Sequence, residues 1–407
     1  MLKEKYSKIF VSLPVLDERD YLPFCLKALE KQTFRNFEVF ICVNQPDEWW
    51  NIEEKKQICI NNQKTLEFLK SYKKISVKII DKSSKYNGWN NKNLGIGWAR
   101  KTIMDKISSS ADNDYLIVSI DADTVFNENY FTSLINIFNK KPEAVAMSVP
   151  YYHNLTNDEV SNKAILRYEI YMRYYLLNLF RINSPYSFTA LGSAIVIPVW
   201  AYKKTGGITP KKSGEDFYFL QKLAKYGKIL NYCSEKVFPA ARFSDRVFFG
   251  TGPAMIKGAK GDWESYPIYD YSLFDEIKKS YELISLLFQK NIETKFLVFI
   301  ENQFKSDNLW KLLRNNSTSF EKFRKAFHGK ADGLRILQFL KSEQKLINKT
   351  DENCLMEFLN KFYKNDFIKT GIDLQTFSFS DLSINTLNKI RNFLFEAEEN
   401  YRKSNTF

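Results

Sequence analysis

Two aspartates separated by one residue follow an apolar run in the first half of the chain. The run at 116–120 holds apolar residues and one serine, and it leads directly into Asp121 and Asp123. Apolar residues on both faces are typical of a strand inside a mostly parallel sheet, which binds ligands at the carboxyl ends of its strands. Carboxylates suit a hard divalent cation. The motif therefore predicts Mg²⁺ or Mn²⁺ at Asp123 and Asp121, bridging a substrate diphosphate and stabilising the leaving phosphate.

A second acidic pair, Glu215 and Asp216, comes after a glycine-containing turn and opens a predicted helix. A carboxylate at such a rim could accept the proton of an attacking hydroxyl group as a general base. A structural alternative also fits. Ser213 at the N-cap with Asp216 three residues later resembles a capping box, and acidic residues suit the first turn of a helix. By itself, the pair is equally compatible with a cap and with a catalytic base.

The elements that must position these acids alternate between strands and helices. Strands are predicted at 9–13, 37–43, 77–80, 115–120, 144–149 and 193–197, with helical segments between most of them. This alternation predicts an α/β fold in three layers with a mostly parallel sheet. From about residue 270 the chain consists of Lys-, Asn- and Phe-rich amphipathic helices. We therefore expect a catalytic domain at 1–267 and an all-helical domain at 268–407.

The charge balance favours anionic ligands. The net charge is +13, and residues 1–269 hold 38 basic against 28 acidic side chains, whereas residues 270–407 hold 22 against 19. An excess of positive charge in the catalytic half suits phosphates or anionic lipid surfaces. No stripe of interleaved arginine and aromatic residues indicates nucleic acid as a partner. The helix at 164–181 is expected to form core or an acceptor-site wall; membrane contact through Tyr174, Leu177 and Phe180 is the alternative.

The location is predicted to be cytoplasmic. The chain has no signal-peptide pattern and no run of 18 or more apolar residues that could span a membrane. Its five cysteines form no C-x-x-C pair and are expected to be reduced thiols. A peripheral position at the inner face of the membrane is compatible with the same pattern. The oligomeric state is not indicated.

The order and spacing of the motifs resemble the inverting nucleotide-sugar glycosyltransferases of family 2, which have the GT-A fold. The matching residues run through about 7–230, and besides the two acidic motifs they are Pro14, Asp17, Glu18, Gln32, Thr33, Glu38, Asn87, Gly88, Ala99 and Arg100. The chain departs from the family at Asn44-Gln45, where an acidic pair is usual. It also lacks the Q-x-x-R-W signature of processive members. The resemblance implies a GT-A-like sheet sandwiched by helices.

The resemblance also implies roles for individual residues. Asp216 would be the catalytic base, supported by Glu215, and Asp123 the metal ligand. Asp121 would contact the ribose or the water shell of the metal. The other nucleotide-sugar contacts would come from Pro14, Asn44 and Asp81 at the base, Asp17 or Glu18 near the ribose, and Asn87 and Arg100.

A glycine-containing loop follows the second acidic motif and carries two arginines. It is interpreted as a lid, in which Arg242 or Arg246 contacts the diphosphate, with Arg246 as the chosen residue. A solvated surface loop is the alternative. With only two histidines in the chain, His153 is a weak candidate for a further metal ligand.

These inferences predict a metal-dependent enzyme of the hexosyltransferase type. It would transfer a sugar with inversion from a nucleotide-diphosphate sugar to a hydroxyl of a glycan or lipid-linked glycan, in surface polysaccharide or glycan assembly. A sugar-phosphate nucleotidyltransferase and a non-catalytic scaffold that binds nucleotide or membrane remain alternatives. No residue indicates which donor or acceptor is used.

Overall fold

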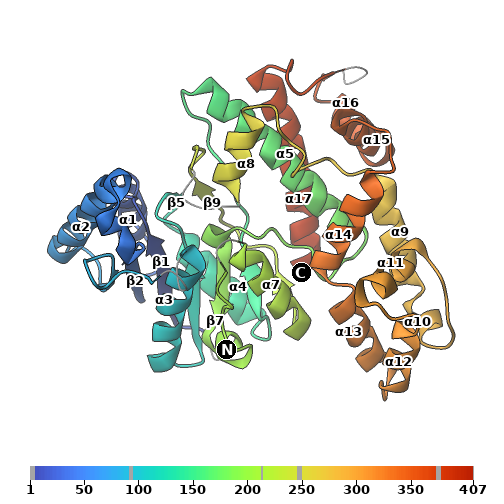
Figure 1. Ribbon diagram of the computed structural model, residues 1–407, viewed down its shortest axis with the longest axis horizontal. Helices are drawn as coiled ribbons and strands as arrows, with labels where there is room; N and C mark the ends of the chain where they lie inside the picture. Colours follow the sequence, from blue (N-terminus) through green and yellow to red (C-terminus); the bar gives the residue numbers. More distant parts are fainter. Residues whose placement is uncertain (1–4, 91–94, 212–213, 245–249, 373–376, 407) are drawn as a thin grey trace. The chain divides into compact units, whose positions relative to one another are not determined.

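The computed structural model describes residues 5–90, 95–211, 214–244, 250–372 and 377–406 (Figure 1). The chain divides into two compact units. The first unit comprises residues 1–162, 188–256 and 402–407, and the second comprises 163–187 and 257–401. Each unit is therefore built from segments that are distant in the sequence. The predicted division at residue 267 into separate domains stays a prediction.

A seven-stranded sheet forms the centre of the first unit. Its spatial order is β3-β2-β1-β4-β7-β6-β8. The strands are β1 (Lys8–Val15), β2 (Phe37–Asn44), β3 (Val77–Lys82), β4 (Tyr115–Ser119), β6 (Ala146–Ser148), β7 (Ile195–Pro198) and β8 (Ile229–Leu230). The first four run parallel, and β7 is antiparallel to both of its neighbours. The predicted fold class, a mostly parallel sheet with helices around it and a helical C-terminal part, is confirmed.

Helices surround this sheet, and a small second sheet adjoins the D-x-D motif. The helices of the first unit are α1 (Leu22–Glu30), α2 (Lys56–Ser71), α3 (Ile96–Ser110), α4 (Tyr130–Lys140), α6 (Val199–Lys204) and α7 (Glu215–Tyr226), with short turns η1 (Asp47–Asn51), η2 (Glu53–Lys55) and η3 (Gly192–Ala194). Strand β5 (Thr124–Phe126) pairs antiparallel with β9 (Val237–Pro239). This pairing joins the chain after Asp123 to the segment that precedes Arg242.

The second unit is helical and has an aromatic core. Its residues form most of α5 (Glu159–Arg181) and α17 (Ile384–Thr406), together with α9 (Tyr271–Glu282), α10 (Ile284–Leu287), α11 (Lys295–Phe304), α12 (Leu309–Asn315), α13 (Phe320–Lys330), α14 (Gly333–Gln344), α15 (Asp351–Phe362) and α16 (Lys364–Ile368). α8 (Thr251–Gly258) includes residues of both units. The side chains of five residues cap helices of this unit by accepting backbone N–H bonds: Asp270, Thr294, Ser319, Asp332 and Thr350.

Helix α5 holds buried charge as well as buried aromatic rings. Arg173 donates to Glu169 at 2.7 Å and to Glu398 of α17 at 2.9 Å, and all three side chains are fully buried. Tyr174, Leu177 and Phe180, which a membrane contact through this helix would need, are buried as well. Within the described ranges, no helix combines the length and apolar character needed to cross a membrane.

The Gln32-Thr33 pair fixes the chain that leaves the D-x-D motif. The Gln32 side chain is fully buried. Its amide nitrogen donates to Asn127 O at 2.8 Å, and its oxygen accepts from the backbone N–H of Phe131 at 3.0 Å. Thr33 donates from its backbone to Glu128 O at 2.9 Å. The two residues therefore hold the start of α4 against the end of α1.

Replacing Gln32 should test this link. Gln32→Leu leaves the buried backbone N–H of Phe131 without its partner and removes the donor to the carbonyl oxygen of Asn127. A buried group left unsatisfied costs roughly 1–3 kcal/mol. We expect the free energy of unfolding of the first unit to fall by about 2–4 kcal/mol, measured by urea titration with circular dichroism. Gln57→Leu, at an exposed position of α2, is the control and should change it by less than about 0.5 kcal/mol. Equal stabilities of the two variants would contradict the assignment.

Candidate active site

The predicted site residues in the first unit lie on several different elements. Pro14 is in β1, Asn44 ends β2, Asp81 lies in β3, Asp121 and Asp123 follow β4, and Glu215 and Asp216 open α7. Parallel strands place their carboxyl ends at one edge of a sheet. The pairing of β1 with both β2 and β4 puts these ends on neighbouring strands. Arginine side chains connect some of these residues to one another, whereas the others form hydrogen bonds with nearby parts of the protein.

Arg100 joins the two acidic motifs. From α3, its guanidinium donates to a carboxylate oxygen of Asp121 and to one of Glu215. The Arg100 side chain is 5 % exposed and that of Glu215 is 3 % exposed. Burial opposes the charged form of Arg100, but Asp121 and Glu215 outweigh it, so the pKa of Arg100 is raised. This arginine therefore links Asp121, which is predicted to lie beside the donor, to Glu215, which is predicted to support the catalytic base.

Two glycines make room for this link. A Cβ atom on Gly192 would lie 2.0 Å from a terminal nitrogen of Arg100, so the guanidinium passes directly over that backbone. A Cβ atom on Gly97, in the first turn of α3, would lie 2.6 Å from the carbonyl oxygen of Lys211. The close approach of α3 to the segment before α7 therefore depends on Gly97, and the position of the Arg100 guanidinium depends on Gly192.

Asp216 has the properties of a base that titrates near neutrality. Burial raises the pKa of its carboxyl group from 3.8 to about 7, and the neighbouring Glu215 acts in the same direction. Arg100 and the backbone N–H of Phe217, which donates to Asp216 at 2.7 Å, limit the rise. The capping-box alternative placed the cap at Ser213, which lies outside the described residues. Gly214 occupies the N-cap position, with φ of 72° and no side-chain cap.

Arg242 joins Asp123 to Glu18. Its Nη2 atom donates to both carboxylate oxygens of Glu18, at 2.6 and 2.7 Å, and to Oδ2 of Asp123 at 2.7 Å. Its Nε atom also donates to Asp123 Oδ2, at 3.0 Å. The guanidinium carbon lies 3.9 Å from the centre of the Tyr21 ring. Although burial opposes the charged form, the two carboxylates raise the pKa of Arg242.

A divalent cation fits the donor set at this position. Asp123 offers one carboxylate, and Mg²⁺ commonly takes one or two protein carboxylates and completes its shell with phosphate and water. The point between Asp123 and Glu18 itself holds Nη2 of Arg242. Among the described residues, no group of three or more His, Cys, Asp or Glu side chains could hold a metal. The weak candidate His153 is buried.

The other predicted contacts of the nucleoside are engaged within the protein. Asn44 donates to Val15 O at 2.8 Å and accepts from the indole N–H of Trp89 at 3.1 Å. Asp81 accepts from the backbone N–H groups of Ser83 and Ser84, each at 2.9 Å. Although burial acts to raise the pKa of Asp81, hydrogen bonds from Ser84 and Ser83 lower it. These side chains support the walls of the edge where a base would bind.

The remaining residues lie around the same framework. Asp17, whose φ is 55°, donates from its backbone to Asn62 and accepts from Asn61, both at 2.9 Å. Asn87 is exposed. The neighbouring Gly88 is required because a Cβ atom there would lie 2.7 Å from the backbone of Asp47. Arg246 lies outside the described residues, so its assignment to the diphosphate stays a prediction.

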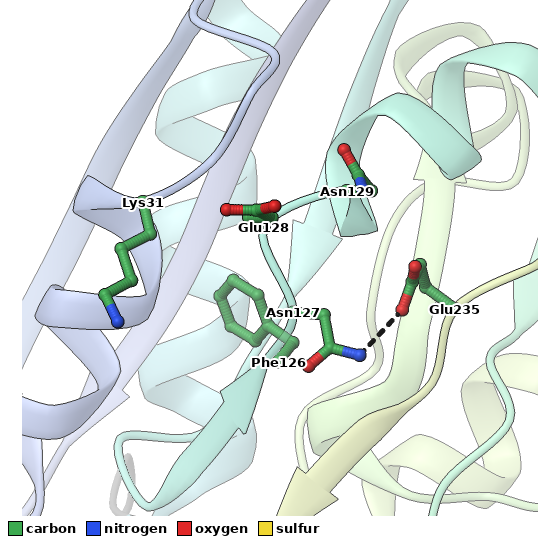
Figure 2. Close-up of a pocket in the computed structure, with 6 residues that line it drawn as sticks. All are labelled: Lys31, Phe126, Asn127, Glu128, Asn129 and Glu235. Carbon is green, nitrogen blue, oxygen red and sulfur yellow. Dashed lines mark hydrogen bonds between the residues drawn. The ribbon is translucent and has the colours of Figure 1, made fainter.

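A separate open pocket lies beyond β5. Lys31, Phe126, Asn127, Glu128, Asn129 and Glu235 line it. Figure 2 shows Asn127 donating to Glu235, at 3.0 Å. None of the predicted site residues lines this pocket.

The sequence did not indicate the contacts that Arg100 and Arg242 make with carboxylates. It assigns Arg242 to the diphosphate and Arg100 to the donor only. No local signal indicates their carboxylate partners.

Comparison with known proteins agrees with the motifs. Residues 116–258 match the model of the glycosyl transferase family group 2, and this segment contains both acidic motifs and Arg242. No curated protein sequence matches the chain.

Two solved structures are similar over most of the chain. S. aureus TarS 1–349, in complex with UDP-GlcNAc, has 14 % identity and a TM-score of 0.41, covering 98 % of this chain and 92 % of that chain. GalNAc-T7 with UDP, GalNAc and Mn²⁺ has 14 % identity and a TM-score of 0.39, covering 81 % and 58 %. At these TM-scores neither similarity carries an argument about function. The family match confirms the predicted resemblance: residues 116–258 of this chain are similar to the glycosyl transferase family group 2.

Proposed function

We propose that this protein is a glycosyltransferase that transfers a sugar from a nucleotide-diphosphate sugar to an acceptor hydroxyl with inversion, using Asp216 as the general base. The observation that carries the proposal is the link from Asp121 through Arg100 to Glu215, beside the carboxyl group of Asp216. It joins the motif expected at the diphosphate to the motif expected at the acceptor. The family match of residues 116–258 supports the same reaction class.

The environment of Asp216 suits the removal of a proton from a hydroxyl group. A general base works best when its pKa lies near the operating pH, because it must be ionised and still bind the proton well. The pKa of Asp216, at about 7, meets both conditions. Arg100 holds Glu215 in place and keeps one positive charge beside the pair. Direct attack by the hydroxyl activated in this way inverts the anomeric carbon.

The donor would bind along the edge formed by the ends of β1 to β4. We assign the base to the region of Pro14, Asn44 and Asp81 and the ribose to the side of Asp17 and Asp121, with Asn87 and Arg246 as further contacts. Mn²⁺ or Mg²⁺ held by Asp123 would neutralise the charge that develops on the departing nucleoside diphosphate. The chain's own residues contribute binding, orientation and proton removal.

The acceptor is proposed to be a glycan or lipid-linked glycan in surface polysaccharide assembly, and the transferred sugar a hexose. A cytoplasmic location, with or without peripheral contact with the membrane, belongs to this proposal. The excess of basic residues in 1–269 supports the proposed ligands, since phosphate-bearing donors and lipid-linked acceptors are anionic.

A panel of nucleotide sugars tests the reaction class. The full chain is incubated with each donor and a set of glycan acceptors, with and without Mn²⁺, and both the nucleoside diphosphate released and the anomeric configuration of the product are measured by NMR. We expect metal-dependent transfer from at least one donor with inverted configuration. In a parallel mixture, release of pyrophosphate from a nucleoside triphosphate and sugar phosphate would instead identify a nucleotidyltransferase. Absence of both transfer and metal-dependent nucleotide binding would identify a scaffold.

Asp216→Asn should reduce transfer by roughly 10²–10⁴-fold, the usual contribution of a general base. The folded-state pKa of Asp216 is raised above its ordinary value, so this group contributes less to stability as pH rises from about 4 to 7. The variant should therefore be at least as stable as the wild type at pH 8, which thermal unfolding would check. Asp114→Asn, at an exposed aspartate before β4, is the control and should keep full activity.

The pH dependence of kcat/KM gives an independent check on the base. Because Asp216 must lose its proton to act, kcat/KM should rise with pH through about 7 and then level off. Removing the positive charge in Arg100→Gln should move this limb to higher pH, since Arg100 favours the ionised carboxylate. If kcat/KM rises at the same pH in the wild type and in the Asp216→Asn variant, Asp216 is not the group whose ionisation causes the rise.

Asp123→Ala should nearly abolish metal-dependent transfer while the fold stays intact. Removing this carboxylate takes away the predicted protein ligand of the cation. We expect the loss of activity to be accompanied by loss of Mn²⁺ binding in the presence of a nucleoside diphosphate, measured by titration calorimetry. Full activity of the variant would rule out this role.

A further inference from the structure

One guanidinium nitrogen occupies the point where three carboxylate oxygens meet. Nη2 of Arg242 lies 2.6 and 2.7 Å from the two oxygens of Glu18 and 2.7 Å from Oδ2 of Asp123. The two carboxylates belong to positions that are far apart in the sequence, and Arg242 is the group that both of them contact. The nitrogen therefore lies between the carboxylate groups of Glu18 and Asp123, next to the D-x-D motif. We call these two carboxylates the cradle.

The cradle is sheltered from solvent and has an uneven charge. The side chains of Glu18 and Asp123 are 8 % and 18 % exposed, and that of Arg242 is 17 % exposed. Two carboxylates and one guanidinium leave one negative charge. Partly buried charges interact more strongly than exposed ones because less water screens them. A second cation is therefore favoured at Asp123 only if it takes over the contacts that Arg242 makes there.

We propose that Arg242 competes with the divalent cation for Asp123, and that Glu18 and Tyr21 hold the displaced guanidinium beside the site. The inference rests on the proposed function in one respect, the role of Asp123 as a metal ligand. Arg242 gives up Asp123 but keeps both oxygens of Glu18 and the face of the Tyr21 ring. Displacement therefore breaks one of its two ion pairs.

The exchange also changes the charge that a donor meets. Before the cation binds, the three side chains of Glu18, Asp123 and Arg242 together carry one negative charge. With a divalent cation added, the same group sums to one positive charge, and the guanidinium no longer bound to Asp123 has free N–H donors. Guanidinium groups bind phosphate oxygens well. Cation binding thus prepares the site for the diphosphate of the donor.

Direct metal binding to the full chain without nucleotide tests the competition. Free Mn²⁺ is measured by its electron paramagnetic resonance signal in titrations of the wild type, Arg242→Gln and Arg19→Gln. Arg19 is exposed and lies next to Glu18 in the sequence, so its loss removes the same charge without freeing Asp123. We expect Arg242→Gln to bind Mn²⁺ roughly 10- to 100-fold more tightly than the wild type, the range for a charged hydrogen-bonded partner. Arg19→Gln should stay within about 2-fold of the wild type.

The outcomes separate this inference from the proposed function. If the wild type binds Mn²⁺ with a nucleoside diphosphate but Arg242→Gln binds the metal no more tightly than the wild type or Arg19→Gln, Arg242 does not compete, and the metal-dependent mechanism still stands. If no variant binds Mn²⁺ with or without the nucleoside diphosphate, both statements fail. The double variant Arg242→Gln with Asp123→Ala should lose the gain in affinity. A retained gain would place the cation elsewhere and overturn the inference.

Discussion

The buried guanidinium of Arg100 is the constraint on which the candidate site depends. It contacts Asp121, which follows β4, and Glu215, which begins α7. A buried arginine is tolerated only when its charge is compensated, and removing one partner of such a pair is strongly destabilising. The carboxylates in turn would repel each other without it. The relative position of the two acidic motifs is therefore fixed by electrostatics as well as by the packing of α3 on the sheet.

Both carboxylates of the D-x-D motif are paired, but in different ways. Asp121 contacts Arg100, which Gly192 and Gly97 allow to approach closely and which is almost fully buried. Asp123 contacts Arg242, whose guanidinium is more exposed and shared with Glu18. The first pair has the character of a permanent part of the framework. In the second pair, a cation could replace Arg242 at Asp123, because Arg242 would still be paired with Glu18.

Several motifs of the family resemblance act on structure. Gln32 and Thr33 hold the chain after the D-x-D motif through bonds to the backbone of 127–131. Gly88 lets its segment pass close to Asp47. Asn44, where the chain departs from the family pattern, is also structural, since it is hydrogen-bonded to Val15 and Trp89. These contacts give the edge of the sheet a defined shape before any ligand binds. They affect the reaction indirectly, because they determine where the acidic side chains lie.

The sequence by itself determined six of the seven strands of the main sheet, its mostly parallel character and the acids that follow β4. Those features follow from local patterns, since a strand buried on both faces must be apolar and must end where polar residues begin. The sequence did not indicate β5, β8 or β9. The tertiary structure decided which charges meet. Arg100 and Glu215 are 115 residues apart, and Arg242 and Glu18 are 224 residues apart. No spacing rule connects such positions, because their contact depends on which strand and helix ends come together. For the same reason the raised pKa of Asp216, which arises from burial, appears only once the chain is folded.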